Sequence, residues 1–198
     1  MIRRFAATML LAAFAVSAMA QDAAPAKEMR RWGGLVQVEA SQGGRDLYDG
    51  EQIFTHMQLG EGVALSVGGF YRLREDSPLE LQFIAGYKAA WFAPVTVGPQ
   101  STLGRWQFQF LANYRNNSKW YVSGGLIAHT SIDYLDDLED AADIHFDNAL
   151  GATIEGGWNW VGLQCTYMEY HASGYGSEDA NNCGIRFTFR FRKWHPPR

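Results

Sequence analysis

The stretch "CGIRFTFRF", residues 183–191, alternates large apolar side chains with polar ones at a strict period of two. In a β-strand, successive side chains point to opposite faces. One face therefore carries Ile185 and three phenylalanines, and the other carries Arg186, Thr188 and Arg190. In a water-soluble sheet the phenylalanines are buried, whereas in an outer-membrane barrel they face lipid and the arginines face the interior. The rest of the chain decides which face lies inside.

The same alternation recurs along the chain, in segments separated by connections that are alternately long and short. The other segments span about 32–40, 63–73, 79–91, 105–114, 119–129, 148–158 and 160–170. With 183–191 they make eight strands, each near the ~9–11 residues that cross a bilayer at a tilt. The pattern predicts an all-β fold: an eight-stranded antiparallel up-and-down transmembrane β-barrel with long external loops and short periplasmic turns.

The N-terminus is organised as a secretory signal peptide. Arg3 and Arg4 precede an apolar run, and Ala18 and Ala20 form an A-x-A-like cleavage site before Gln21. A membrane anchor is the alternative, but the run is short for a spanning helix. No other segment approaches the ~20 apolar residues that such a helix needs. We expect a signal peptide at 1–20, an N-terminal lead-in at 21–31, an outer-membrane barrel at 32–191 and a C-terminal tail at 192–198.

Composition excludes one class of partner. The chain has 198 residues, which suits a single domain, and a net charge of −4. It contains no block of Lys and Arg that would follow a phosphate backbone, so we expect no nucleic-acid partner.

Cys165 and Cys183 fall on adjacent predicted strands and on the same outward face. An exported protein can oxidise them, but the unknown register leaves a disulfide open.

Aromatic residues on the apolar faces sort by height. If the chain enters from the periplasm, one group falls near the periplasmic ends: Trp32, Tyr71, Tyr114, Trp120, Trp158 and Trp160. The other falls toward the outer ends: Tyr87, Trp91, Trp106 and Tyr167. Two aromatic girdles that bound an aliphatic band are typical of membrane barrels. A soluble lipocalin-like barrel, the alternative fold, gives no reason for such sorting.

Three stretches carry a resemblance to a known group: "GEGVALSVGGFYRLRED" (60–76), "FDNALGATIEGGW" (146–158) and "GIRFTFRF" (184–191). They resemble the small eight-stranded outer-membrane β-barrel proteins of Gram-negative bacteria, which include the OmpA-like transmembrane barrel. The resemblance covers nearly the whole mature chain and implies the barrel fold and the cell outer membrane. It implies contact with outer-membrane lipid, lipopolysaccharide and the barrel-assembly machinery, and we expect a monomer. Such proteins often end on the aromatic residue of the last strand, whereas here "RKWHPPR" follows Phe191.

Charged side chains gather on the predicted inward face. Buried charges have to be paired, because an isolated charge is costly in a low dielectric. Arg186 and Arg190 each need an internal carboxylate, and Glu39 on the neighbouring first strand is the nearest candidate. We therefore expect an interior plugged by polar side chains, with a structural or surface-interaction role, no catalysis and no cofactor. The predicted network is Glu39, Arg72, Glu80, Lys88, Arg105, Glu155, Arg186 and Arg190.

Two functional alternatives stay open. His129 and Ser131 form an H-x-S pair that resembles the outer-membrane lipid A deacylases, with Glu155 or Glu139 as the acid. A serine, a histidine and a carboxylate suffice for hydrolysis. Strand parity places both His129 and Ser131 inward, however, whereas a deacylase must present its nucleophile to lipid. A small OmpW-like channel for hydrophobic solutes is the other alternative, and it requires an apolar inner path.

The segment 130–147 is acidic and reads as an external loop. Carboxylates at this density are the ligands that Ca²⁺ and Mg²⁺ prefer. The candidate ligands are Asp136, Asp137, Glu139 and Asp140. Their spacing does not match an EF-hand loop, so the sequence favours a solvated loop without a bound metal.

Overall fold

The computed structural model describes residues 31–49, 56–74, 77–92, 101–115, 119–136, 144–172 and 176–191. The predicted signal peptide at 1–20 and the C-terminal tail at 192–198 lie outside these ranges. The regular secondary structure of the described residues is entirely β. None of it is a helix long and apolar enough to cross a membrane.

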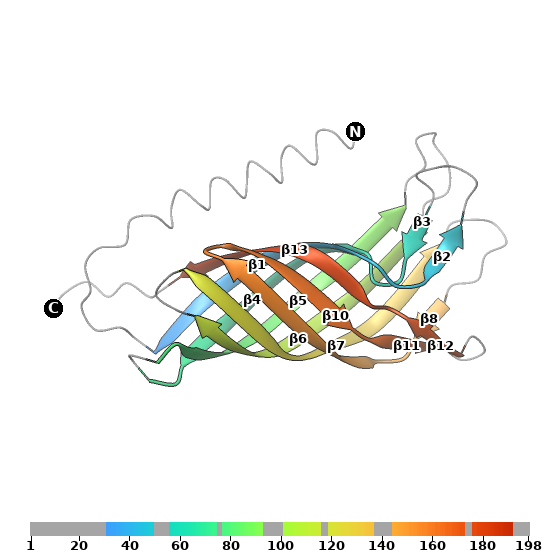
Figure 1. Cartoon of the computed structure of the whole chain (residues 1–198). Coiled ribbons are helices and arrows are strands. Elements are labelled where there is room, and N and C mark those ends of the chain that lie inside the picture. Colours follow the sequence, from blue (N-terminus) through green and yellow to red (C-terminus); the bar gives the residue numbers. More distant parts are fainter. Residues whose placement is uncertain are drawn as a thin grey trace.

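Eight long strands form a closed antiparallel barrel (Figure 1). They are β1 (Trp32–Gln42), β4 (Gly62–Arg72), β5 (Leu79–Phe92), β6 (Ser101–Arg115), β7 (Trp120–Asp136), β9 (Ala149–Trp158), β10 (Val161–Tyr167) and β13 (Asn182–Phe191). Their order is β6-β5-β4-β1-β13-β10-β9-β7, and β7 pairs back with β6. The first and last strands pair along their length, with Glu39 opposite Arg186. The predicted fold class is confirmed.

Five short strands lie at one end of the barrel, on the right in Figure 1, and one of them, β8, pairs with β7. They are β2 (Asp46–Asp49), β3 (His56–Gln58), β8 (Ile144–Phe146), β11 (Glu169–Ala172) and β12 (Gly176–Asp179). We call this the loop end, and the opposite end, where the short connections lie, the turn end. At the turn end, Asn159 takes a φ of +57° between β9 and β10, a conformation that asparagine tolerates better than most residues. The tight turn predicted there is present.

A bulge in β7 separates the barrel wall from the loop end. Pairing with β6 shifts between Gly104, which lies opposite Asp133, and Trp106, which lies opposite Thr130. Ser131 occupies the extra position with a φ of +49° and is exposed. An inserted residue changes which face the following side chains take. The prediction that Ser131 faces inward is therefore wrong, and so is the prediction of a loop throughout 130–147, because β7 continues to Asp136.

Burial is inverted relative to a water-soluble protein. Leu150, Leu65 and Phe83 are 70%, 62% and 58% exposed, whereas Gln107, Glu80 and Lys88 are each 1% exposed. In soluble domains large apolar side chains are buried, and Lys and Glu almost never are. The outward band is therefore a lipid-facing surface. The soluble lipocalin-like alternative is excluded.

The outward aromatic side chains pair across strands near both ends of the apolar band. Toward the turn end, the ring centroids of Trp120 and Trp158 lie 5.0 Å apart. Toward the loop end, those of Tyr87 and Trp106 lie 5.3 Å apart. One outward residue differs from expectation: Phe189 is only 6% exposed, because the Trp160 ring stacks over it and over Phe187. The side chain of Trp91 is not among those described.

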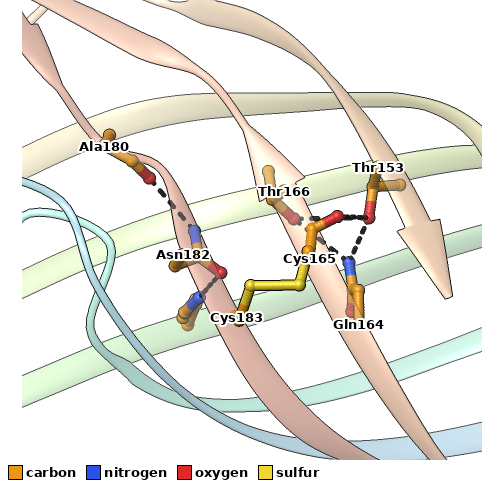
Figure 2. The surroundings of a disulfide bond; sticks show 8 residues. Thr153, Gln164, Cys165, Thr166, Ala180, Asn182 and Cys183 are labelled. Carbon is orange, nitrogen blue, oxygen red and sulfur yellow. Dashed lines mark hydrogen bonds between the residues drawn. A yellow bond between two sulfur atoms is a disulfide. The ribbon is translucent and has the colours of Figure 1, made fainter.

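A disulfide joins two barrel strands on the outer wall, and Figure 2 shows it between β10 and β13. Cys165 and Cys183 are direct cross-strand partners, and their Cα atoms lie 4.1 Å apart. On the other face of β10, the Gln164 amide donates to the Thr153 hydroxyl at 2.7 Å. The register that the sequence left open thus brings the two thiols together, while the inner face stays polar.

Candidate functional site in the barrel interior

The middle of the barrel is crossed by an ion-pair network that joins four strands. The Arg186 guanidinium lies between two carboxylates, with Nη2 2.8 Å from Glu39 Oε2 and Nη1 3.0 Å from Glu155 Oε2. Lys88 Nζ lies 3.2 Å from the other Glu39 oxygen. The Tyr121 hydroxyl donates to Glu155 Oε1 at 2.5 Å. We call Glu39, Lys88, Glu155 and Arg186 the central network, and all four side chains are at most 4% exposed.

A second ion-pair group lies toward the turn end. Glu80 accepts from Arg72 Nη2 at 3.0 Å and from Arg190 Nη2 at 2.6 Å. Arg190 was expected to use Glu39, but it lies opposite Leu35, four residues along β1. That separation is roughly 13 Å along a strand, so Glu80 is the carboxylate within reach. The Arg190 guanidinium also covers the Phe70 ring, 4.5 Å from its centroid.

Arg105 is fully buried but does not join a carboxylate. Its Nη2 donates to the backbone oxygen of Glu61 at 2.7 Å. Its Nε and Nη1 have no hydrogen-bond partner among the described residues. The expected carboxylate pairing is therefore not found for Arg105. With Lys88 and Arg186, it makes three buried cations against two carboxylates, Glu39 and Glu155.

The candidate catalytic residues are not brought together. His129 Nδ1 lies 2.6 Å from the Tyr170 hydroxyl inside the barrel. Burial of Tyr170 in β11, beyond the spanning strands, raises its pKa to about 12, so the phenol stays protonated. Ser131 faces outward because of the bulge, and Glu155 is bound to Arg186 and Tyr121. Tyr170 itself was missed, although its even position on the predicted strand 160–170 places it on the inward face.

Apolar layers lie on both sides of the central network. The loop-end layer includes Leu59, Leu103, Ile132, Phe146 and Met168, all at most 8% exposed. The smaller turn-end layer is Leu35, Phe70, Ile84 and Leu111. The interior is thus less polar than predicted, because β7 and β8 extend the barrel wall past the bulge and turn apolar residues inward. Such surroundings strengthen the ion pairs between them by lowering the local dielectric.

The candidate metal ligands fall largely outside the part of the chain that the structure describes. Asp137, Glu139 and Asp140 are not described, and nothing is stated of the Asp136 side chain. Within the described ranges, no three His, Cys, Asp or Glu side chains are grouped so that they could hold a metal ion.

A closed eight-stranded barrel with an apolar, aromatic outer wall and an ionic inner wall defines a transmembrane β-barrel of the outer-membrane type. No protein-family model and no curated protein sequence matches the chain.

Several solved structures are similar in fold. Ail, the attachment invasion locus protein of Yersinia pestis, is 10% identical, with a TM-score of 0.46 over 82% of this chain and 100% of that one. Neisserial surface protein A is 12% identical, with a TM-score of 0.43 over the same shares. The N-terminal β-barrel domain of Pseudomonas aeruginosa OprF is 16% identical, with a TM-score of 0.33, again over 82% and 100%. At these scores, the assignment to the class rests on the geometry of the barrel itself.

Proposed function

We propose that the protein is an integral outer-membrane barrel with a structural or surface-interaction role and a closed interior. The observation that carries this proposal is the central network, in which Arg186 binds Glu39 on one side and Glu155 on the other. Glu39 and Arg186 stand on the neighbouring strands β1 and β13. Glu155 on β9 and Lys88 on β5, which are three strands apart in the closed order of eight, extend the network across the lumen. Breaking a buried pair of this kind costs about 3–5 kcal/mol, which opposes opening of a continuous water path.

The loop-end apolar layer supports the same conclusion. A channel for hydrophobic solutes needs apolar side chains that line an open path. Here Leu103, Ile132 and Phe146 point inward but are 0%, 0% and 8% exposed, so they fill the space that such a path would require. Below them lies the central network, whose charges an apolar solute would have to pass.

The loop end is the surface that meets partners. It carries the strands that project beyond the apolar band, including the β11–β12 hairpin, in which Glu169 lies opposite Asp179. Outer-membrane lipid and lipopolysaccharide surround the wall below it, and the barrel-assembly machinery inserts the chain. The protein works as a monomer and without catalysis.

Three measurements test this function. In planar bilayers the purified protein is expected to give no steady conductance, and a reproducible open state would overturn the closed interior. In cells it is expected in the outer-membrane fraction, with migration on gels that changes on heating, and recovery from the soluble periplasm would overturn membrane embedding. Labelled lipid A is expected to stay intact. Release of acyl chains by the wild type, lost in His129→Ala, would overturn the non-catalytic role.

A further inference from the structure

The barrel interior holds more cations than carboxylates. Basic side chains point inward from several of the described strands: Arg72, Lys88, Arg105, Arg115, Arg186 and Arg190. The inward carboxylates of the same strands are fewer: Glu39, Glu80 and Glu155. Toward the turn end the arginines are half-buried and reach water, whereas Lys88, Arg105 and Arg186 in the middle are at most 1% exposed. The excess positive charge at the middle of the barrel is therefore cut off from water.

Arg105 carries this excess. It stands directly opposite Lys88 in the pairing of β5 with β6, and both side chains point into the barrel. Like charges directly opposite each other in a sheet are destabilising. Lys88 is neutralised by Glu39, but Arg105 donates only to a backbone oxygen, and its Nε and Nη1 have no hydrogen-bond partner among the described residues. A buried polar group without a partner points to a water or an ion that completes it, and a buried unpaired charge favours the ion.

A second donor without a partner lies on the same side of the lumen. His129 on β7 stands opposite Gln107 on β6, two residues along from Arg105, so His129 and Arg105 are diagonal neighbours on the inner face. The protonated Tyr170 phenol donates to His129 Nδ1 at 2.6 Å, and an imidazole that accepts at Nδ1 carries its proton on Nε2. His129 Nε2 is buried and has no partner among the described residues. The Tyr170 ring also lies 6.0 Å from the Arg105 Cζ atom, so the three side chains form one cluster.

The surroundings of this cluster favour a small anion. On the loop-end side, Leu103 stands two residues from Arg105 on β6 and belongs to the loop-end apolar layer. On the other side lies the central network, which Lys88 joins. Beside the two cations stand Ala64, opposite Lys88 on β4, and Ala90 on β5, both buried and each with a single methyl group. Because attraction between charges strengthens as the dielectric falls, an anion is held more strongly here than at an exposed arginine.

We propose that the barrel interior binds one monovalent inorganic anion, such as chloride, on the Arg105 guanidinium, with His129 Nε2 as a second donor. One negative charge balances the single positive charge that the three buried cations hold in excess of Glu39 and Glu155. The anion belongs to the closed interior and does not pass through it. It is an exchangeable counterion, so it leaves when its cation is removed.

The first test is urea unfolding of the full chain in vesicles of a zwitterionic phospholipid, with the bulky anion gluconate replaced stepwise by chloride at constant ionic strength. Once chloride exceeds its dissociation constant, each tenfold rise in its concentration is expected to raise the ratio of folded to unfolded protein about tenfold. Arg105→Met is expected to remove this dependence, and His129→Phe to shift it to higher chloride. Arg190→Met is the matched control, because it removes an inward arginine that has a carboxylate partner in Glu80, so the dependence should stay.

The second test locates the anion in the wild type and needs no variant that folds. Bromide has the charge of chloride and scatters X-rays anomalously. Crystals of the full chain grown in bromide are expected to show one anomalous peak inside the barrel, within hydrogen-bond distance of an Arg105 guanidinium nitrogen.

Several outcomes overturn the proposal. A wild-type folding equilibrium that does not respond to chloride, or a bromide map without a peak at Arg105, would mean that water or a carboxylate of the chain satisfies the guanidinium. A chloride dependence that persists in Arg105→Met would place the anion elsewhere. Bromide peaks confined to exposed arginines would show an adventitious ion only.

Discussion

Replacing Glu39 by glutamine is expected to destabilise the barrel more than any exposed charge substitution. Glu39 neutralises two buried cations at once, with 2.8 Å to Arg186 and 3.2 Å to Lys88. Glutamine keeps the volume and removes the charge. Arg186 then retains Glu155, but Lys88 loses its carboxylate and keeps only neutral acceptors, the glutamine oxygen and Asn182 Oδ1 at 3.4 Å.

The size of the effect follows from burial. Removing one partner of a buried ion pair leaves a charge without compensation and costs about 3–5 kcal/mol. Lys88 is 1% exposed and cannot recover that loss from water. The double variant Glu39→Gln/Lys88→Met removes the stranded charge too, so it is expected to recover much of the loss. Glu178→Gln is the matched control, because the ion pair of Glu178 with Arg45 lies at the exposed loop end and is worth about 0–1 kcal/mol.

The assay is urea unfolding in phospholipid vesicles. It is followed by tryptophan fluorescence and by the fraction of protein that migrates on a gel as the folded, heat-modifiable band. Each variant gives a free energy of unfolding relative to the wild type. Two results would refute the reasoning: a Glu39→Gln loss no greater than that of Glu178→Gln, or a double variant as unstable as the single one. Either would mean that Lys88 does not depend on Glu39 for its charge.

Three further predictions use the same unfolding assay. Cys183→Ser opens the link to Cys165 across an 18-residue separation and is expected to cost about 3 kcal/mol; reductant should have the same effect on the wild type and none on the variant. Gly125→Val is expected to prevent folding, because its Cβ would lie 2.1 Å from a backbone oxygen of β6, whereas Gly156→Val, with open space around it, should fold normally. Arg105→Met is expected to cost less than Glu39→Gln, since it removes a buried cation that has no carboxylate partner among the described residues; an equal loss would show that a carboxylate of the chain compensates the charge.

Most of the fold can be predicted from the period-two alternation of the strands. Because side chains alternate with a period of two, one choice of lipid-facing side fixes the facing of every residue in a strand. The exposed Phe83 and the buried Glu80 on β5 both follow from that single choice. The pairing of the first and last strands follows from closure of the barrel, and it sets Glu39 opposite Arg186.

Periodicity fails where the register is not regular. Nothing in "HTSID" marks Ser131 as an extra residue, because a bulge is set by the pairing of two strands rather than by the composition of one. A carboxylate partner for Arg105 is predicted from charge alone. In the structure its guanidinium donates instead to the backbone oxygen of Glu61. The partner of Arg190 likewise depends on the distance along β1 from Leu35, which lies opposite Arg190, to Glu39. Parity gives the face of a residue but not this distance.

The bulge in β7 is the common cause of two features, the inward position of Ile132 and the outward position of Asp133. It lets β7 continue the barrel wall beyond the aromatic girdle while exchanging the roles of odd and even positions. Without an extra residue, Asp133 would share the inward face of His129, and Ile132 would point to lipid. With it, Ile132 enters the loop-end apolar layer and Asp133 turns outward to His145. One inserted residue therefore supplies an apolar side chain to the barrel interior and a carboxylate to the outer wall, at the level where a bilayer changes from hydrocarbon to headgroup.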